Sequence, residues 1–159
     1  MFADPLTARL VEFVRGIGIA VRAESLEPTT FLPGIAIRHG GLVIDPPSLA
    51  YPGDILHEAG HIAVSDPAER YQETLTPNDG DELAAIAWSY AAIRWLGLDP
   101  AIVFHEAGYR GSSRAFIENF SAGRYFGVPL LQWYGLTIEP RRGKSSEHEP
   151  YPHMLRWLR

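Results

Sequence analysis

The sequence predicts an α+β fold, in which a small mixed or antiparallel sheet lies beside a bundle of helices. Three short apolar runs near the amino end have the length and flanking turn residues of strands, and longer segments around them have the capping residues of helices. The chain has 159 residues, of which 46% are hydrophobic and 21% are charged, and this suits one globular domain. We expect that domain to span residues 1–138, followed by a polar, proline-rich tail over residues 139–159.

The first predicted element is a helix over residues 4–15. Asp4 and Pro5 suit its N-cap and first position, and apolar residues recur behind them at helical spacing. Gly16 ends this helix. Three alternating apolar residues then indicate a short strand: Ile17, Ile19 and Val21.

A hairpin is predicted next, with strands at residues 34–38 and 42–45. The residues between them, His39-Gly40-Gly41, contain the glycines that a tight turn needs. Either strand of this hairpin is a candidate for pairing with an extended peptide.

Two helices are predicted at residues 52–64 and 81–96. Asn78 or Asp79 is expected to cap the second helix, and Gly97 to end it. Its aromatic residues are expected in the core: Trp88, Tyr90 and Trp95. Two shorter helices are expected further on, at residues 112–123 and 128–134.

The composition excludes several kinds of function. Cysteine is absent, which rules out disulfides, thiol catalysis, iron–sulfur clusters and cysteine-based zinc sites. The net charge of −5 argues against a nucleic-acid partner, because such proteins usually present a basic face. Residues 54–82 hold eight acidic residues and one basic residue, and this local excess favours cations.

The sequence also predicts a cytoplasmic protein with no membrane partner. Residues 1–15 lack the basic start and the uninterrupted apolar stretch of a signal peptide. The longest uncharged apolar stretch, residues 83–93, is too short to span a bilayer.

The pentapeptide His57-Glu58-Ala59-Gly60-His61 is an H-E-x-x-H motif on a predicted helix. Residues four apart lie on one face of a helix, so the two imidazoles can bind one metal ion. Glu58 is rotated away by about 100° and is placed to take a proton from water. Without a metal this would be a helix with two surface histidines, but its apolar flanks indicate burial, which is costly for unpartnered polar groups. The expected metal is Zn²⁺.

A third protein ligand is needed, and Glu82 is the preferred candidate. It lies 21 residues after His61, in the first turn of the next predicted helix, which can bring it beside the motif. An acid at that position can instead complement the helix dipole. Three other acids remain alternatives as the third ligand: Glu73, Asp79 and Asp81.

A second cluster, His105-Glu106-Ala107-Gly108-Tyr109-Arg110, repeats part of the motif without its second histidine. Its side chains are candidate donors to the oxyanion that forms when an amide is hydrolysed, with His105 and Tyr109 ahead of Arg110. His105 is also a candidate extra ligand. The alternative is a helix end with a capped histidine and a surface arginine.

This constellation over residues 34–96 resembles the zincin metallopeptidases of the glutamate-zincin branch, in which a second helix supplies a glutamate. The small size resembles bacterial members that cleave phage-immunity repressors or radiation-response regulators. The sequence Glu82-Leu83-Ala84-Ala85-Ile86-Ala87 departs from the E-A-N-x-F-A-like pattern of the radiation-response group. The resemblance implies a zincin-like fold, with His57, His61 and Glu82 as zinc ligands and Glu58 as general base.

The predicted function is a zinc-dependent hydrolase, a metallopeptidase with a peptide or protein substrate. The alternative is a non-catalytic, metal-binding regulatory or protein-interaction module on a zincin scaffold. Family analogy alone suggests a third class, a partner in a stress-response or toxin–antitoxin system. A homo-oligomer is compatible with the sequence, and the basic tail from Glu139 is a candidate lid over the acidic motif region.

Overall fold

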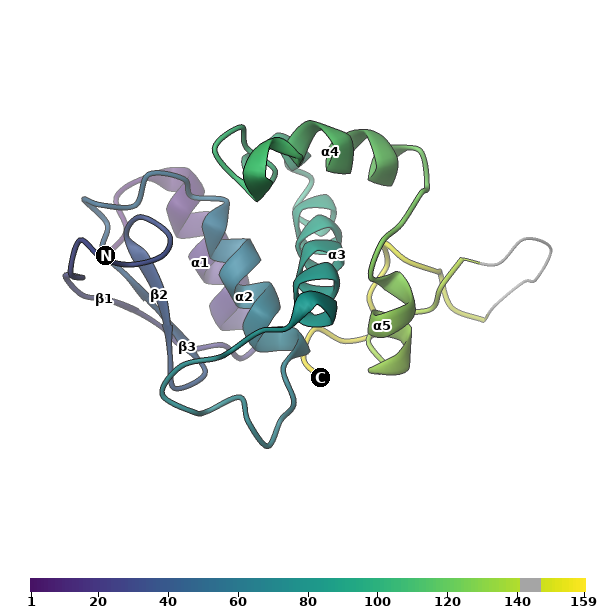
Figure 1. Ribbon diagram of the computed structural model, residues 1–159, viewed down its shortest axis with the longest axis horizontal. Helices are drawn as coiled ribbons and strands as arrows, with labels where there is room; N and C mark the ends of the chain where they lie inside the picture. Colours follow the sequence, from purple (N-terminus) through teal and green to yellow (C-terminus); the bar gives the residue numbers. More distant parts are fainter. Residues whose placement is uncertain (141–146) are drawn as a thin grey trace.

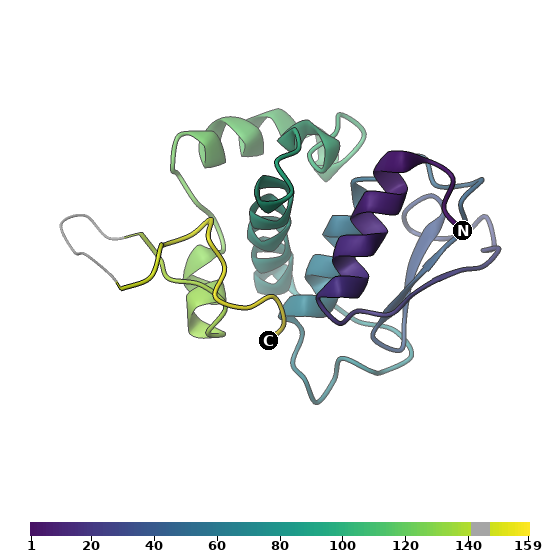
Figure 2. The same cartoon turned by 180° about the vertical axis from the view of Figure 1, so that it is seen from behind.

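The computed structural model describes residues 1–140 and 147–159. These residues form an α+β fold that contains five α-helices and one three-stranded mixed sheet (Figure 1). The sheet and α3 lie on opposite sides of α2, and α1 covers the back of α2 (Figure 2). None of the helices in this described part is long and apolar enough to cross a bilayer.

The predicted first helix is confirmed as α1 (Pro5–Gly16). The Asp4 carboxylate caps it by accepting a hydrogen bond of 2.7 Å from the Thr7 backbone N–H. The strand that follows, β1 (Val21–Ala23), begins later than the apolar alternation predicted. Ile17 still belongs to the end of the helix and Gly18 turns the chain at a φ of 101°, so the extended backbone starts only afterwards.

The predicted hairpin is confirmed as β2 (Ile35–Arg38) and β3 (Gly41–Ile44). The two residues between them, His39 and Gly40, both have positive φ, as a two-residue type I′ turn requires. The strand order is β1-β3-β2, with β1 parallel and β2 antiparallel to β3. The buried strand β3 is therefore central, and β2 lies at one edge of the sheet.

Two adjacent helices form the centre of the molecule, α2 (Asp54–Val64) and α3 (Asp79–Trp95). They approach closely where Gly60 faces α3, because a Cβ at that position would lie 3.0 Å from the Ala85 carbonyl oxygen. The helix α3 begins two residues before the predicted boundary. Asn78 caps it in a reciprocal capping box with Asp81, which extends the helix towards its N-terminus.

Two of the three aromatic residues expected in the core of α3 are there. Trp88 is fully buried and Tyr90 is 5% exposed. The prediction for Trp95 is wrong, since its side chain is 64% exposed. It is the last residue of α3, and its described ring contact, with Trp157, is edge to face, which leaves most of the indole exposed.

The remaining elements are two 3-10 turns, η1 (Pro100–Ile102) and η2 (Tyr109–Gly111), and the helices α4 (Ser113–Ser121) and α5 (Val128–Trp133). Both short predicted helices are thus confirmed, with slightly shorter bounds. The helix α4 lies across the end of α3, and α5 lies on the side of α3 away from the sheet (Figure 1).

The predicted tail is described at residues 139–140 and 147–159, and its second part crosses α3 on the face seen in Figure 2 and ends at α2. The buried Tyr151 hydroxyl donates to the Ala87 carbonyl at 2.8 Å, and Trp88 donates to the Trp157 carbonyl at 3.0 Å. The Arg159 backbone N–H reaches the Ala63 carbonyl at 3.0 Å. This segment therefore ties the two central helices together, while residues 141–146 of the predicted lid lie outside the described residues.

Candidate metal centre

His57 and His61 lie one turn apart on the same face of α2, and their rings meet edge to face at 4.7 Å. Their Nε2 atoms are 3.2 Å apart. Glu82 approaches from the first turn of α3, with Oε2 at 2.9 Å from His61 Nε2 and Oε1 at 3.5 Å from His57 Nε2. All three ligand atoms lie within 4.8 Å of one another. The structure therefore brings together the three residues that the sequence predicted as metal ligands.

The rival acids do not join this group. The Asp81 carboxylate accepts a hydrogen bond of 3.0 Å from the Asn78 backbone N–H, which holds it in the helix cap. Glu73 and Asp79 are exposed and are not part of the three-residue group in the described residues.

The spacing of the group fits a zinc ion. A tetrahedral zinc with bonds of about 2.0 to 2.1 Å holds its ligand atoms about 3.3 Å apart. The two histidine Nε2 atoms are 3.2 Å apart, close to that value, and Glu82 presents one oxygen to each histidine, Oε2 at 2.9 Å from His61 and Oε1 at 3.5 Å from His57. Two imidazoles and one carboxylate also leave a fourth position open, which is the donor set of catalytic rather than structural zinc sites.

The protonation states of His57, His61 and Glu82 in the absence of a metal are also compatible with binding of a cation. Burial lowers the pKa of His57 to about 4, so this imidazole is neutral. Burial acts against ionisation of His61 and Glu82 as well, but their mutual hydrogen bond and charges outweigh it. The pKa of His61 is therefore raised and that of Glu82 lowered. A metal would replace the proton that these two residues share.

Glu58 lies beside the group without joining it. Its Oε1 is 4.0 Å from His57 Nε2. Burial raises the pKa of its carboxyl to about 7, with the charge of Asp54 adding to the effect and that of His61 opposing it. A carboxyl with a pKa near neutrality can both take up and release a proton at physiological pH, as a general base must.

Tyr109, a predicted oxyanion donor, contacts His57. Its hydroxyl is 2.9 Å from Nδ1 of His57, on the opposite side of the imidazole from Nε2, the atom that faces His61 and Glu82. The left-handed backbone at Tyr109 and Arg110 turns the chain here, with φ values of 54° and 53°. Sequence reasoning identified the residue but not this contact, because nothing in the local pattern indicates two consecutive left-handed residues.

His105 is held by Asp54 and does not belong to the three-residue group. Its Nε2 lies 2.7 Å from Asp54 Oδ1, and its ring stacks on Tyr51 at 4.0 Å. Burial raises the pKa of Asp54, and the contact with His105 opposes that shift. Sequence analysis counted Asp54 only among the eight acidic residues of 54–82. Its position one turn before Glu58 was the available signal for a role near the motif.

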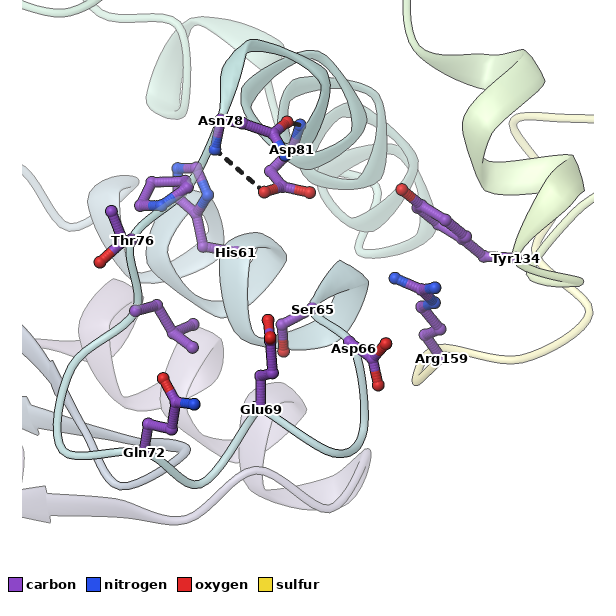
Figure 3. A pocket seen from close by; sticks show the side chains of 12 residues that line it. His61, Ser65, Asp66, Glu69, Gln72, Thr76, Asn78, Asp81, Tyr134 and Arg159 are labelled. Carbon is purple, nitrogen blue, oxygen red and sulfur yellow. Dashed lines mark hydrogen bonds between the residues drawn. The ribbon is translucent and has the colours of Figure 1, made fainter.

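A cleft of about 420 Å³ opens beside His61 (Figure 3). One wall comes from the end of α2 and the loop after it, and another from the start of α3. Arg159 lies at the far side, over the Tyr134 ring at 3.9 Å. The carboxylates that line the cleft belong to Asp66, Glu69 and Asp81.

Comparisons with protein-family models, curated proteins and solved structures found no match to this chain.

Proposed function

We propose that this protein is a zinc-dependent hydrolase, a metallopeptidase that cleaves a peptide or protein chain on a zincin-like scaffold. The observation that carries the proposal is the convergence of His57, His61 and Glu82, with Glu58 beside them. The order of hairpin, motif helix and glutamate helix agrees with the resemblance to the glutamate-zincins.

In this proposal His57, His61 and Glu82 hold the zinc, which when bound polarises the scissile carbonyl and acidifies a water molecule. Glu58 takes a proton from the attacking water and delivers it to the leaving amine. Its buried position keeps the carboxyl poised near neutral pH for both transfers.

Two surfaces are candidates for binding the peptide substrate: the cleft beside His61 and the edge strand β2. The cleft beside His61 offers space next to a proposed ligand. The strand β2 is at the edge of the sheet, so its outer side can pair with an extended peptide, whereas β3 is paired on both sides. Of the two hairpin strands that the sequence left open, β2 is therefore the candidate for strand addition.

A second candidate function is a metal-binding module without catalysis. It is favoured by the two expected oxyanion donors, since Tyr109 and His105 bind His57 and Asp54 instead. A peptidase of this design would need another donor, such as a backbone N–H or the metal itself.

The test is digestion of a broad peptide library by the zinc-loaded protein and by Glu58→Gln. We expect cleavage by the wild type and its loss in the variant, while both retain about one zinc per chain. Cleavage at an unchanged rate in the variant would contradict the role of Glu58. Zinc binding with no cleavage of any peptide would favour the non-catalytic module.

A further inference from the structure

The hydroxyl of Tyr109 is the described hydrogen-bonding partner of His57 on the side away from the proposed metal. The two atoms, Tyr109 Oη and His57 Nδ1, are 2.9 Å apart, and the rings meet edge to face at 5.2 Å. His61 has no such support, because its buried Nδ1 has no hydrogen-bond partner among the described residues. The two histidines of the motif are therefore held in different ways.

The segment that carries Tyr109, residues 105–113, is fixed by several contacts. The Ser113 hydroxyl donates to the His105 carbonyl at 2.6 Å, and His105 in turn contacts Asp54. The Tyr109 ring packs edge to face on Phe116 at 5.3 Å. Positive φ is unfavourable for an aromatic residue and persists only where the surroundings impose it. The backbone is thus strained at Tyr109, the residue that contacts His57.

The chemistry of a metal-bound imidazole explains such an arrangement. A metal takes the lone pair of one ring nitrogen, so a neutral imidazole must carry its proton on the other nitrogen. In His57 the metal-facing nitrogen is Nε2, which leaves an N–H at Nδ1 that needs an acceptor. The Tyr109 oxygen lies where that acceptor is required.

We propose that Tyr109 is a positioning residue of the metal site, which accepts the Nδ1–H of His57 and so holds this ligand in the tautomer and orientation that bind zinc. The inference rests on the proposed zinc site and replaces the expected role of Tyr109 as an oxyanion donor. Outer-shell partners of this kind commonly contribute about 10- to 100-fold to metal affinity.

The experiment measures the affinity of the full chain for Zn²⁺ by competition with a chelator, for the wild type, Tyr109→Phe and Tyr125→Phe. Tyr125 is the matched control, because it lies in an aromatic cluster on Phe120 and Tyr151, away from the metal group. We expect Tyr109→Phe to bind zinc about 10- to 100-fold more weakly and Tyr125→Phe to remain within about twofold of the wild type.

A second measurement does not depend on a variant. In the zinc-loaded wild type, nitrogen-15 NMR of His57 should show a slowly exchanging proton on Nδ1 and no proton on Nε2. Equal zinc affinity of the wild type and Tyr109→Phe would overturn the role of Tyr109 and leave the zinc site standing. A proton found on Nε2 would show that His57 does not bind zinc through this nitrogen, and it would overturn both the proposed ligand geometry and this inference. If the wild type itself binds no zinc, the proposed site fails, and this inference fails with it.

Discussion

The side chain of Glu82 has an orientation that its place in the helix does not explain. Glu82 lies in the first turn of α3, where an acid would be favourable for the helix dipole alone, yet both its oxygens face the motif histidines. The helix dipole explains why an acid is favourable at this position, but it does not explain why the side chain points towards the two histidines. The separate contribution of Glu82 can therefore be tested at the level of one residue.

We expect Glu82→Ala to lose zinc affinity by at least about 100-fold, since removing a ligand should cost no less than removing an outer-shell partner. Glu73→Ala is the matched control, because this exposed acid was a rival ligand and is not in the group. The metal content per chain of the two variants, measured by elemental mass spectrometry, shows which of the two acids is the third ligand. Loss of zinc in the control instead would move the third ligand to Glu73.

Glu58 should make the metal-free protein less stable as the pH rises. Its pKa is about 7 in the folded chain, against an ordinary value of 4.5. The folded state therefore holds this proton more tightly, and stability is lost as the pH rises from 4.5 to about 7. Glu58→Gln removes the effect, which is worth about 3 kcal/mol above neutrality.

In the presence of a chelator, Glu58→Gln should thus unfold at a temperature several degrees above the wild type at pH 8, with most of the difference gone at pH 5. Thermal denaturation followed by circular dichroism checks this. An equal difference at both pH values would mean that ionisation of Glu58 is not its cause.

At the scale of elements, the site depends on where α3 begins. The capping box between Asn78 and Asp81 starts the helix just before Glu82 and so sets the height of this carboxylate along the helix axis. We expect Asn78→Ala to lower the free energy of unfolding by about 1 kcal/mol and to weaken zinc binding, while Asn78→Asp keeps both. Urea denaturation and zinc competition measure the two effects, and unchanged zinc affinity in Asn78→Ala would show that the cap does not position Glu82.

The contact between α2 and α3 depends on Gly60. Alanine is favoured over glycine inside a helix by about 1 kcal/mol, but here its Cβ would lie 3.0 Å from the backbone oxygen of Ala85, which cannot move independently of α3. We expect Gly60→Ala to destabilise the fold by about 1 to 3 kcal/mol and to weaken zinc binding, because the helices must move apart.

Gly16→Ala in α1 is the control for that substitution, since nothing lies within 4 Å of a Cβ at Gly16. It should be neutral or slightly stabilising. Urea denaturation of the two variants compares them directly. A Gly60→Ala protein as stable as the wild type would show that the two helices can separate at little cost.

At the scale of the whole molecule, acidic residues are concentrated around the proposed site. The cleft beside His61 is lined by three carboxylates, and its one arginine lies over a tyrosine ring. This charge should attract positively charged peptides, and salt should screen the attraction.

We therefore expect zinc-loaded Glu58→Gln, which binds without cleaving, to bind lysine- and arginine-rich peptides more tightly than acidic ones of the same length. Raising the salt concentration should weaken that preference, and so should Glu69→Lys in the same background. Fluorescence anisotropy of labelled peptides gives the affinities. A preference for acidic peptides would show that the cleft does not govern binding.

Much of this molecule follows from local sequence, because it depends on residues close together in the chain. Asp4 and Pro5 start α1, the turn residues His39 and Gly40 produce the hairpin, and the spacing of His57 and His61 puts both imidazoles on one helical face. Helical period, capping and turn chemistry act over a few residues, so they can be predicted without the fold.

Contacts between distant segments were decided only by the tertiary structure. The selection of Glu82 over its neighbouring acids required the packing of α3 on α2, and the contact of Tyr109 with His57 joins residues 52 positions apart. The contact of Asp54 with His105 joins residues 51 positions apart, and Trp95 stays exposed because its described ring contact, with Trp157, is only edge to face. Local rules state which side chains can do chemistry, but packing between distant elements decides which of them meet.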